Sequence, residues 1–177
     1  MRETVSILIS EEAIRERVAE LGATISADYA GESFIMVCVL KGAVVFMTDL
    51  ARKLQGNVLF DFIGSSSYGD GTTSSGKVRI TKDVDLDVEG KHVLLVEDIL
   101  DTGHTLSFLR QHFLQKGVAS LKTCVLLDKP DRRVVLSEKA DYVGFNIPDQ
   151  FVIGYGLDYA QRYRNLPYIG LLNISED

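Results

Sequence analysis

Four continuous apolar runs alternate along the chain with segments whose apolar residues recur at helical spacing. Runs without regular polar positions are typical of strands that are covered on both faces, because neither side of such a strand meets water. Shorter runs within residues 141–159 flank Pro148 and Asp149 and predict short strands around a turn. The predicted buried strands lie at residues 34–40, 57–63, 91–99 and 121–127.

Three helices are predicted before and between these strands. The first begins after Ser10, because a serine can cap the first turn and Glu11 and Glu12 lie at its positive end. The second covers residues 43–54. Strands that alternate with helices predict a single α/β domain over residues 1–177, with a mostly parallel twisted sheet flanked by helices on both faces. Helical spacing marks the first and third helices through Ile14, Val18, Leu21 and Ile25, then Leu106, Leu109 and Phe113, with Gly117 at the end.

Residues 64–76, GSSSYGDGTTSSG, are dominated by glycine, serine and threonine. A segment with so few apolar side chains cannot pack a core, so it predicts a long loop. Long loops inside compact domains are typically either functional or disordered. The following residues, 77–88, predict a strand or hairpin arm that leads back into the sheet.

The composition, 46% hydrophobic and 25% charged, is typical of a globular protein. A net charge of -6 argues against binding to nucleic acid or to an anionic membrane surface. Cys38 and Cys124 lie inside apolar runs without metal-ligand spacing, which favours buried, reduced thiols. No apolar run approaches the roughly 20 residues of a membrane span, and the N-terminus does not resemble a signal peptide. We therefore expect a cytoplasmic protein.

The stretch at residues 93–106, VLLVEDILDTGHTL, places three acids at the end of a predicted buried strand. The turn from Asp101 to Thr105 opens the next helix, where unpaired N–H groups and the helix dipole favour an anion. Gly103 lets the main chain approach a ligand closely, so the turn is a candidate phosphate cradle. Because Glu97 and Asp98 would repel a phosphate, we expect them to bind sugar hydroxyls, a Mg2+ ion or a proton that moves in a reaction.

Three other interpretations of this stretch compete. A helix cap with solvated acids is common, but paired acids in a buried strand are not. A response-regulator receiver domain needs roughly another hundred residues after the strand, more than follow residue 97. A haloacid-dehalogenase-like phosphatase requires an Asp-x-Asp pair, whereas Asp98 and Asp101 are three positions apart.

The same stretch resembles the phosphoribosyl-pyrophosphate (PRPP) binding motif of type I phosphoribosyltransferases: an apolar strand, two acids, two apolar residues and Asp-Thr-Gly-x-Thr. Four further segments resemble regions of the hypoxanthine-guanine phosphoribosyltransferases. They are VCVLKGAVVFMTDL for the pyrophosphate loop, SSSYG for the start of the mobile catalytic loop, LLDKP for the base-recognition strand and PDQFVIGYGLDYAQRYRNLPYIG for the base-binding hood. The resemblance implies that the mobile loop, residues 64–76, is a lid that closes during turnover and excludes water. The resemblance implies a type I phosphoribosyltransferase fold with a small hood contributed by the N- and C-terminal segments.

The resemblance implies a purine salvage reaction. Hypoxanthine or guanine and PRPP would give IMP or GMP and pyrophosphate, with Mg2+ as cofactor. Asp101 would act as general base and acid at N7 of the purine, and the turn that follows would hold the 5'-phosphate. The implied PRPP and phosphate contacts are Glu97, Asp98, Asp101, Thr102, Gly103, His104 and Thr105, and the implied metal ligands are Glu97, Asp98 and Asp158.

The resemblance also implies contacts for the base and the leaving group. Lys129 would donate to the purine O6 and select against adenine, which presents an amino donor there. Phe151 would stack on the purine, although core packing is its simpler interpretation; solvated charge is the simpler interpretation of Lys41 and Arg164. The loop at Lys41 would carry a cis peptide bond. The implied pyrophosphate contacts are Lys41, Gly42, Arg164 and, from the lid, Ser67 and Tyr68; the implied base site contains Lys129, Phe151, the main chain of Val152, and Asp158.

Two other functions are compatible with these motifs. A xanthine-preferring transferase would share all of them. A nucleotide-sensing regulator that binds RNA on the same fold would keep the Asp-Thr-Gly-x-Thr turn but would need a basic face, whereas this chain is acidic and carries Lys129 and a base-binding segment. The resemblance favours the salvage enzyme, with small-molecule substrates and assembly as a homodimer or homotetramer.

Overall fold

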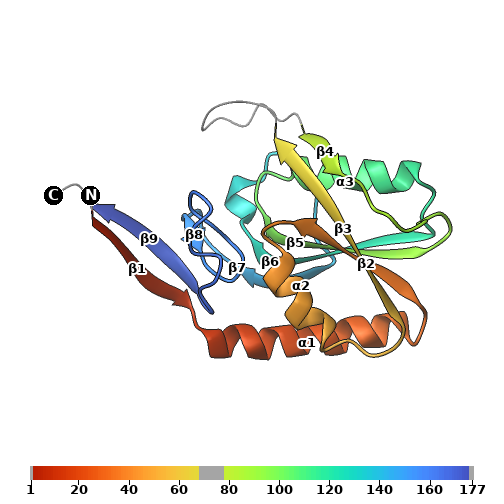
Figure 1. Ribbon diagram of the computed structural model, residues 1–177, viewed down its shortest axis with the longest axis horizontal. Coiled ribbons are helices and arrows are strands. Elements are labelled where there is room, and N and C mark those ends of the chain that lie inside the picture. Colours follow the sequence, from red (N-terminus) through yellow and green to blue (C-terminus); the bar gives the residue numbers. More distant parts are fainter. Residues whose placement is uncertain (1, 68–77, 176–177) are drawn as a thin grey trace.

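The computed structural model describes residues 2–67 and 78–175, and within them the strands form two sheets (Figure 1). The larger sheet has the strand order β4-β3-β2-β5-β6-β7, in which all neighbours are parallel except β3 and β4. This confirms the predicted mostly parallel sheet. Its strands are β2 (Phe34–Leu40), β3 (Val58–Ser67), β4 (Val78–Lys82), β5 (His92–Leu100), β6 (Ser120–Asp128) and β7 (Tyr142–Asn146).

Helices α1 (Glu11–Tyr29) and α2 (Val44–Ala51) cover one face of this sheet, and α3 (His104–Gln115) covers the other (Figure 1). Alternate residues of β2 explain why both faces are apolar: Met36 packs with α1 and α2, whereas Val37 packs with α3. The continuous apolar run therefore does indicate a strand buried on both sides. The serine oxygen of Ser10 accepts from the Ala13 N–H at 3.2 Å, which confirms the predicted cap of α1.

The chain changes direction within the sheet between β2 and β5. From β2 it proceeds outward to β3, whereas from β5 it proceeds the other way to β6 and β7. In open α/β sheets, the carboxyl ends of the strands at such a switch point form a crevice that binds ligands. The predicted pyrophosphate loop follows β2 and the predicted phosphate loop follows β5, so both lie at this point.

A second, antiparallel sheet has the order β1-β9-β8 and joins the two ends of the described chain (Figure 1). The resemblance implied a hood from the N- and C-terminal segments, and this sheet, which we call the hood, is built from both. The side chains of Arg162 and Tyr163 both hydrogen-bond Glu3 of β1, so this contact also joins segments from opposite ends of the chain. The strands are β1 (Arg2–Ile9), β8 (Val152–Ile153) and β9 (Ile169–Ser175).

The predicted loop at residues 64–76 is wrong at its start. Gly64–Ser67 belong to β3, and their main-chain groups hydrogen-bond with β4 in a hairpin. Their small polar side chains do not indicate a strand, because this pairing depends on the partner rather than on local residue type. Residues 68–76 lie outside the described residues. The predicted arm at 77–88 is a strand only over Val78–Lys82, and the predicted helix at 43–54 is confined to Val44–Ala51.

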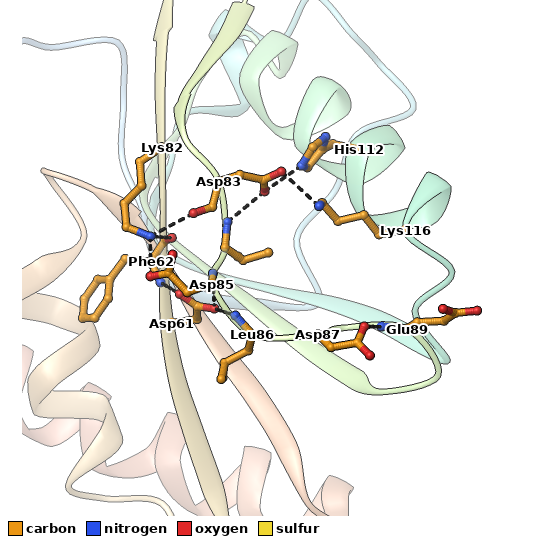
Figure 2. A network of polar contacts seen from close by, with 11 residues as sticks. Asp61, Phe62, Lys82, Asp83, Asp85, Leu86, Asp87, Glu89, His112 and Lys116 are labelled. Carbon is orange, nitrogen blue, oxygen red and sulfur yellow. Dashed lines mark hydrogen bonds and ion pairs between the residues drawn. The ribbon is translucent and has the colours of Figure 1, made fainter.

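Polar contacts, rather than further strand pairing, anchor the chain after β4 (Figure 2). One oxygen of the buried Asp61 carboxylate accepts from the N–H groups of Asp85 and Leu86, at 2.9 and 2.8 Å. Asp83 accepts from Lys116 at 2.9 Å and lies 2.9 Å from His112 Nε2; His112 is in the last turn of α3 and Lys116 is its C-cap. The returning arm is thus fixed to β3 and to α3. Among the described helices, none is long and apolar enough to cross a membrane.

Candidate active site

The predicted site residues converge at the carboxyl ends of three adjacent strands. Lys41 and Gly42 follow β2, Asp101 follows β5, and Lys129 follows β6. The register brings these ends together, because Cys38 of β2 pairs with Val96 of β5, and Leu100 of β5 pairs with Asp128 of β6. The Lys129 N–H also donates to the Leu100 carbonyl at 2.9 Å, which places Lys129 beside Asp101.

Glu97 and Asp98 form the acidic floor of this site. Glu97 is only 4% exposed, and its Oε1 has no hydrogen-bond partner. Burial raises the pKa of Glu97 to about 8, and the charges of Asp98 and Asp101 add to the effect. Burial also raises the pKa of Asp98 to about 6, although the hydrogen bond that Asp98 accepts from the Ile99 N–H favours the ionised form. A buried carboxyl oxygen without a partner is suited to a ligand hydroxyl or cation.

The loop after β2 packs directly against these acids. The peptide bond between Leu40 and Lys41 is cis, as the resemblance implied. A Cβ placed on Gly42 would lie 1.8 Å from Asp98 Oδ2, so only glycine fits at this position. Gly156, with φ of 101°, meets the Gly42 carbonyl from the other side, where its own Cβ would come within 2.2 Å. The Lys41 loop, the Asp98 carboxylate and the Gly156 turn therefore form one packed unit.

Asp101, Thr102 and Gly103 form the turn from β5 into α3. Gly103 is the N-cap of α3 with φ of 89°, a conformation that other residues adopt only with strain. The Thr102 N–H donates to Asp101 Oδ1 at 2.6 Å, so the carboxylate folds back over its own loop. His104 and Thr105 are the first residues of α3, where the N–H groups have no acceptor within the helix. The turn thus has the geometry of an anion site.

The candidate pyrophosphate side chains share one partner that sequence reasoning missed. Gln161 Oε1 accepts from Arg164 Nη2 at 3.1 Å and from Lys41 Nζ at 3.5 Å. Arg164 also pairs with Asp158 at 3.0 Å and donates to the Gly156 carbonyl at 2.7 Å. Arg164 is therefore fixed in the site rather than a solvated terminal charge. Gln161 gives no signal in the sequence, because its contacts depend on a positive-φ turn between the hood strands β8 and β9.

The predicted base site lies between β6 and the hood. Lys129 is 8% exposed and its Nζ donates to the Gln150 carbonyl at 2.6 Å; burial lowers its pKa, while Asp149 opposes that shift. Phe151 is 57% exposed, so core packing does not account for it. Its ring meets Tyr159 edge to face, with centroids 5.9 Å apart. Val152 is buried in β8. An exposed aromatic ring beside a buried lysine suits a flat ligand with a polar edge.

The carboxylates of the site do not form a preassembled metal cage. Within the described residues, no three or more His, Cys, Asp or Glu side chains are grouped so that they could hold a metal ion. Asp158 is already paired with Arg164. Their oxygen chemistry nevertheless fits Mg2+, which proteins commonly hold through one or two carboxylates together with substrate phosphates.

Ser67 and Tyr68 are the predicted contacts from the lid, and no contact among the described residues brings Ser67 into the site. Ser67 is the last residue of β3 and pairs with Val78, and Tyr68 lies outside the described residues.

Comparisons with known proteins give consistent matches. The family model described as the phosphoribosyl transferase domain matches residues 5–160. The chain is 50% identical over 166 residues to a hypoxanthine-guanine phosphoribosyltransferase of Streptococcus thermophilus, covering 94% of this chain and 92% of the relative. It is 52% identical over 166 residues to the bifunctional protein TilS/HprT of Listeria innocua, of which it spans only 26%. A crystal structure of a hypoxanthine-guanine phosphoribosyltransferase of Bacillus anthracis is 50% identical and has a TM-score of 0.90, with 94% of this chain and 97% of that chain covered.

Proposed function

The chain belongs to the phosphoribosyltransferase family, and we propose that it is a purine salvage enzyme that transfers the phosphoribosyl group of PRPP to hypoxanthine and guanine. The products would be IMP or GMP and pyrophosphate. The observation that carries the proposal is the juxtaposition of Asp101 and Lys129 at neighbouring strand ends, with the exposed ring of Phe151 on the hood. A phosphate turn, a titratable group and a buried donor for a base thus share one site.

Asp101 is proposed as the general base and acid at purine N7. The N7 proton becomes acidic as the bond to the sugar forms at N9, so a carboxylate is strong enough to accept it. The Thr102 N–H holds one oxygen of this carboxylate at 2.6 Å, which limits its orientation. The 5'-phosphate would occupy the turn formed by residues 101–105, at the amino end of α3.

Lys129 and Phe151 would select and hold the base. The Lys129 ammonium donates to the Gln150 carbonyl and would direct one of its hydrogen bonds to the O6 of a 6-oxopurine. Adenine presents an amino donor at the same place, so the ammonium and the base would face each other donor to donor. Phe151 would stack on the purine face, and the main chain of Val152 would read its C2 edge.

Lys41, Gly42 and Arg164 would bind the pyrophosphate, and Glu97 would meet the ribose hydroxyls. Glu97 and Asp98 would hold one Mg2+ beside those hydroxyls, and Asp158 would reach a second Mg2+ near the pyrophosphate. Bound Mg2+ would supply positive charge that stabilises the leaving pyrophosphate. The unpaired Oε1 of Glu97 supports a ligand at this floor. Ser67 and Tyr68 would contact the same substrate from the lid.

The test is pyrophosphate release from PRPP and Mg2+, with hypoxanthine, guanine, xanthine, adenine and uracil assayed in parallel. Turnover with hypoxanthine or guanine and none with adenine is the expected result. The Asp101→Asn variant keeps an oxygen for the Thr102 N–H but loses the base, so its kcat should fall about 100-fold or more. A preference for xanthine would replace the substrate assignment. Binding of PRPP without turnover of any base would contradict the enzyme assignment.

We further propose that the enzyme is cytoplasmic and assembles as a homodimer or homotetramer. Cys38 and Cys124 are free and buried, which suits a reducing compartment. Leu59 and Phe60 of β3 are 45% and 53% exposed, and burial against a second subunit would remove this apolar surface from water. Light scattering of the purified protein at several concentrations tests the assembly; a monomer at all of them would contradict it.

A further inference from the structure

Arg133 makes three hydrogen bonds through all three nitrogens of its guanidinium. Nε donates to the Asp101 carbonyl at 2.9 Å, Nη1 donates to the Glu138 carbonyl at 2.6 Å, and Nη2 pairs with the Asp128 carboxylate. Its side chain is only 10% exposed. Arginine suits this position because its planar fork can hold three acceptors at once, which a lysine ammonium cannot do in the same plane.

The Asp101–Thr102 peptide unit is held from both of its ends. Arg133 binds its carbonyl oxygen, and its N–H, on the opposite side of a planar trans peptide, donates to Asp101 Oδ1. The orientation that Arg133 imposes on this peptide is therefore passed directly to the Asp101 carboxylate. No other side chain among the described residues hydrogen-bonds either end of this unit.

The segment that carries Arg133 also backs the rest of the turn. The N–H groups of Val134 and Val135 both donate to the Thr102 carbonyl at 2.9 Å. Because that carbonyl is held on one side, the Gly103 N–H of the same peptide unit points to the other. A Cβ on Gly103 would lie 3.2 to 3.4 Å from side-chain atoms of this segment, so a larger residue would have to displace them by a few tenths of an ångström as well as adopt a strained φ of 89°.

Arg133 also contacts the part of the site that is proposed to bind the purine base, through Asp128. Asp128 is the last residue of β6, directly before Lys129. One buried guanidinium thus ties the residue preceding the base-recognition lysine to the carbonyl of the residue that begins the phosphate turn. Glu138, whose carbonyl Arg133 also holds, is in turn fixed by Arg110 of α3 at 3.0 Å.

We infer that Arg133 is a positioning residue that orients the phosphate turn and the Asp101 carboxylate relative to Lys129. It touches no substrate in this role. The inference rests on the proposed function, because its ligands are those of the proposed reaction. Loss of the Arg133 fork should loosen the turn at Asp101 and Thr102, and the contribution of a 5'-phosphate to ligand binding should fall.

The test compares the dissociation constants of IMP and inosine, which differ only in the 5'-phosphate, by titration calorimetry on the full chain. In the Arg133→Lys variant, the ratio of inosine to IMP dissociation constants should fall about tenfold or more, as expected for the loss of a charge-assisted hydrogen-bond arrangement. The KM for PRPP should rise in parallel. Asp128→Asn, which weakens the anchor of Arg133 without altering the turn, should lower the same ratio to a smaller extent.

Arg17 provides a matched control. Its Nε and Nη2 donate to the Gly144 and Val143 carbonyls at 2.9 and 2.8 Å, so it is also an arginine that holds main-chain carbonyls, between α1 and β7. Arg17→Lys should lower the unfolding temperature but leave the inosine-to-IMP ratio unchanged. This separates positioning from general stabilisation.

The outcomes are distinguishable. If the wild type binds IMP more tightly than inosine and folded Arg133→Lys shows the same inosine-to-IMP ratio, the positioning role alone is overturned. If Arg133→Lys does not fold, an unchanged ratio in Asp128→Asn would do the same. Equal affinity of the wild type for IMP and inosine, together with no turnover, would overturn the proposed function and the inference with it.

Discussion

Gly42 approaches Asp98 so closely that a Cβ on the glycine would lie 1.8 Å from the Asp98 carboxylate oxygen. The two residues come from the ends of different strands, β2 and β5, and meet at the switch point of the sheet. The contact fixes the distance between the candidate pyrophosphate loop and the acidic floor. It also explains why a glycine follows the cis peptide bond at Lys41.

The Gly42→Ala variant should lose most of its activity. The added methyl group cannot be accommodated without moving the loop or Asp98, and a displacement of about 1 Å in an active site costs about 100-fold in rate. The measurement is kcat/KM for PRPP, with thermal unfolding in parallel. Gly90→Ala is the control, because its φ of 65° strains an added side chain while its Cβ would meet no atom within 4 Å. That variant should be destabilised but retain its activity.

The Phe151→Ala variant should bind nucleotide weakly while remaining stable. Its ring is 57% exposed, so truncation should change the free energy of unfolding by less than about 1 kcal/mol. Loss of stacking on a base costs about 1–3 kcal/mol, so the IMP dissociation constant should rise about fivefold to 100-fold. Phe151→Tyr keeps the ring and should behave as wild type. An unchanged IMP affinity in Phe151→Ala would place the base elsewhere.

The Glu97→Gln variant should become progressively more stable than the wild type as pH rises. Burial raises the folded-state pKa of Glu97 to about 8, well above the unfolded value near 4.5. The folded protein therefore keeps a proton that the unfolded chain releases, and the wild type loses stability between about pH 4.5 and 8. We expect a relative change on the order of a few kcal/mol, measured by denaturant unfolding without Mg2+. Parallel pH profiles for the two proteins would contradict a buried, unpartnered Glu97.

Asp83 should change the pH dependence of stability in the opposite direction to Glu97, because its stabilising effect is lost as pH falls. Burial opposes its ionisation, but hydrogen bonds from His112 and Lys116 outweigh that effect and lower its pKa to about 2. Its stabilisation is therefore present above about pH 4 and is lost as pH falls toward 2. The carboxylate is 39% exposed, so Asp83→Asn should cost only about 1 kcal/mol or less at pH 7. Thermal unfolding at several pH values should show the two proteins converging below pH 4; a constant difference would contradict the ion pairs.

Local sequence determined the elements and the chemistry of the turn. Continuous apolar runs specified β2, β5 and β6, because a strand covered on both faces must be apolar throughout. Ser10 specified the start of α1 through a hydrogen bond within its own first turn. The turn that begins at Asp101 was predicted as a phosphate cradle, because such a site at a helix start needs only neighbouring residues. These features depend on interactions over a few positions, which sequence displays directly.

Tertiary structure decided what depends on partners far apart in the chain. The pairing of β1 with β9 joins opposite ends of the described chain, and the extension of β3 over Gly64–Ser67 depends on a hairpin partner. Gln161 accepts hydrogen bonds from Lys41 and Arg164 only because the fold brings a turn of the hood next to the end of β2. Arg133 sits in a short polar segment whose sequence resembles a surface loop, yet the fold buries its guanidinium behind Asp101. Burial and long-range hydrogen bonding are properties of packed surfaces, and no local pattern of residue types encodes which distant surfaces will meet.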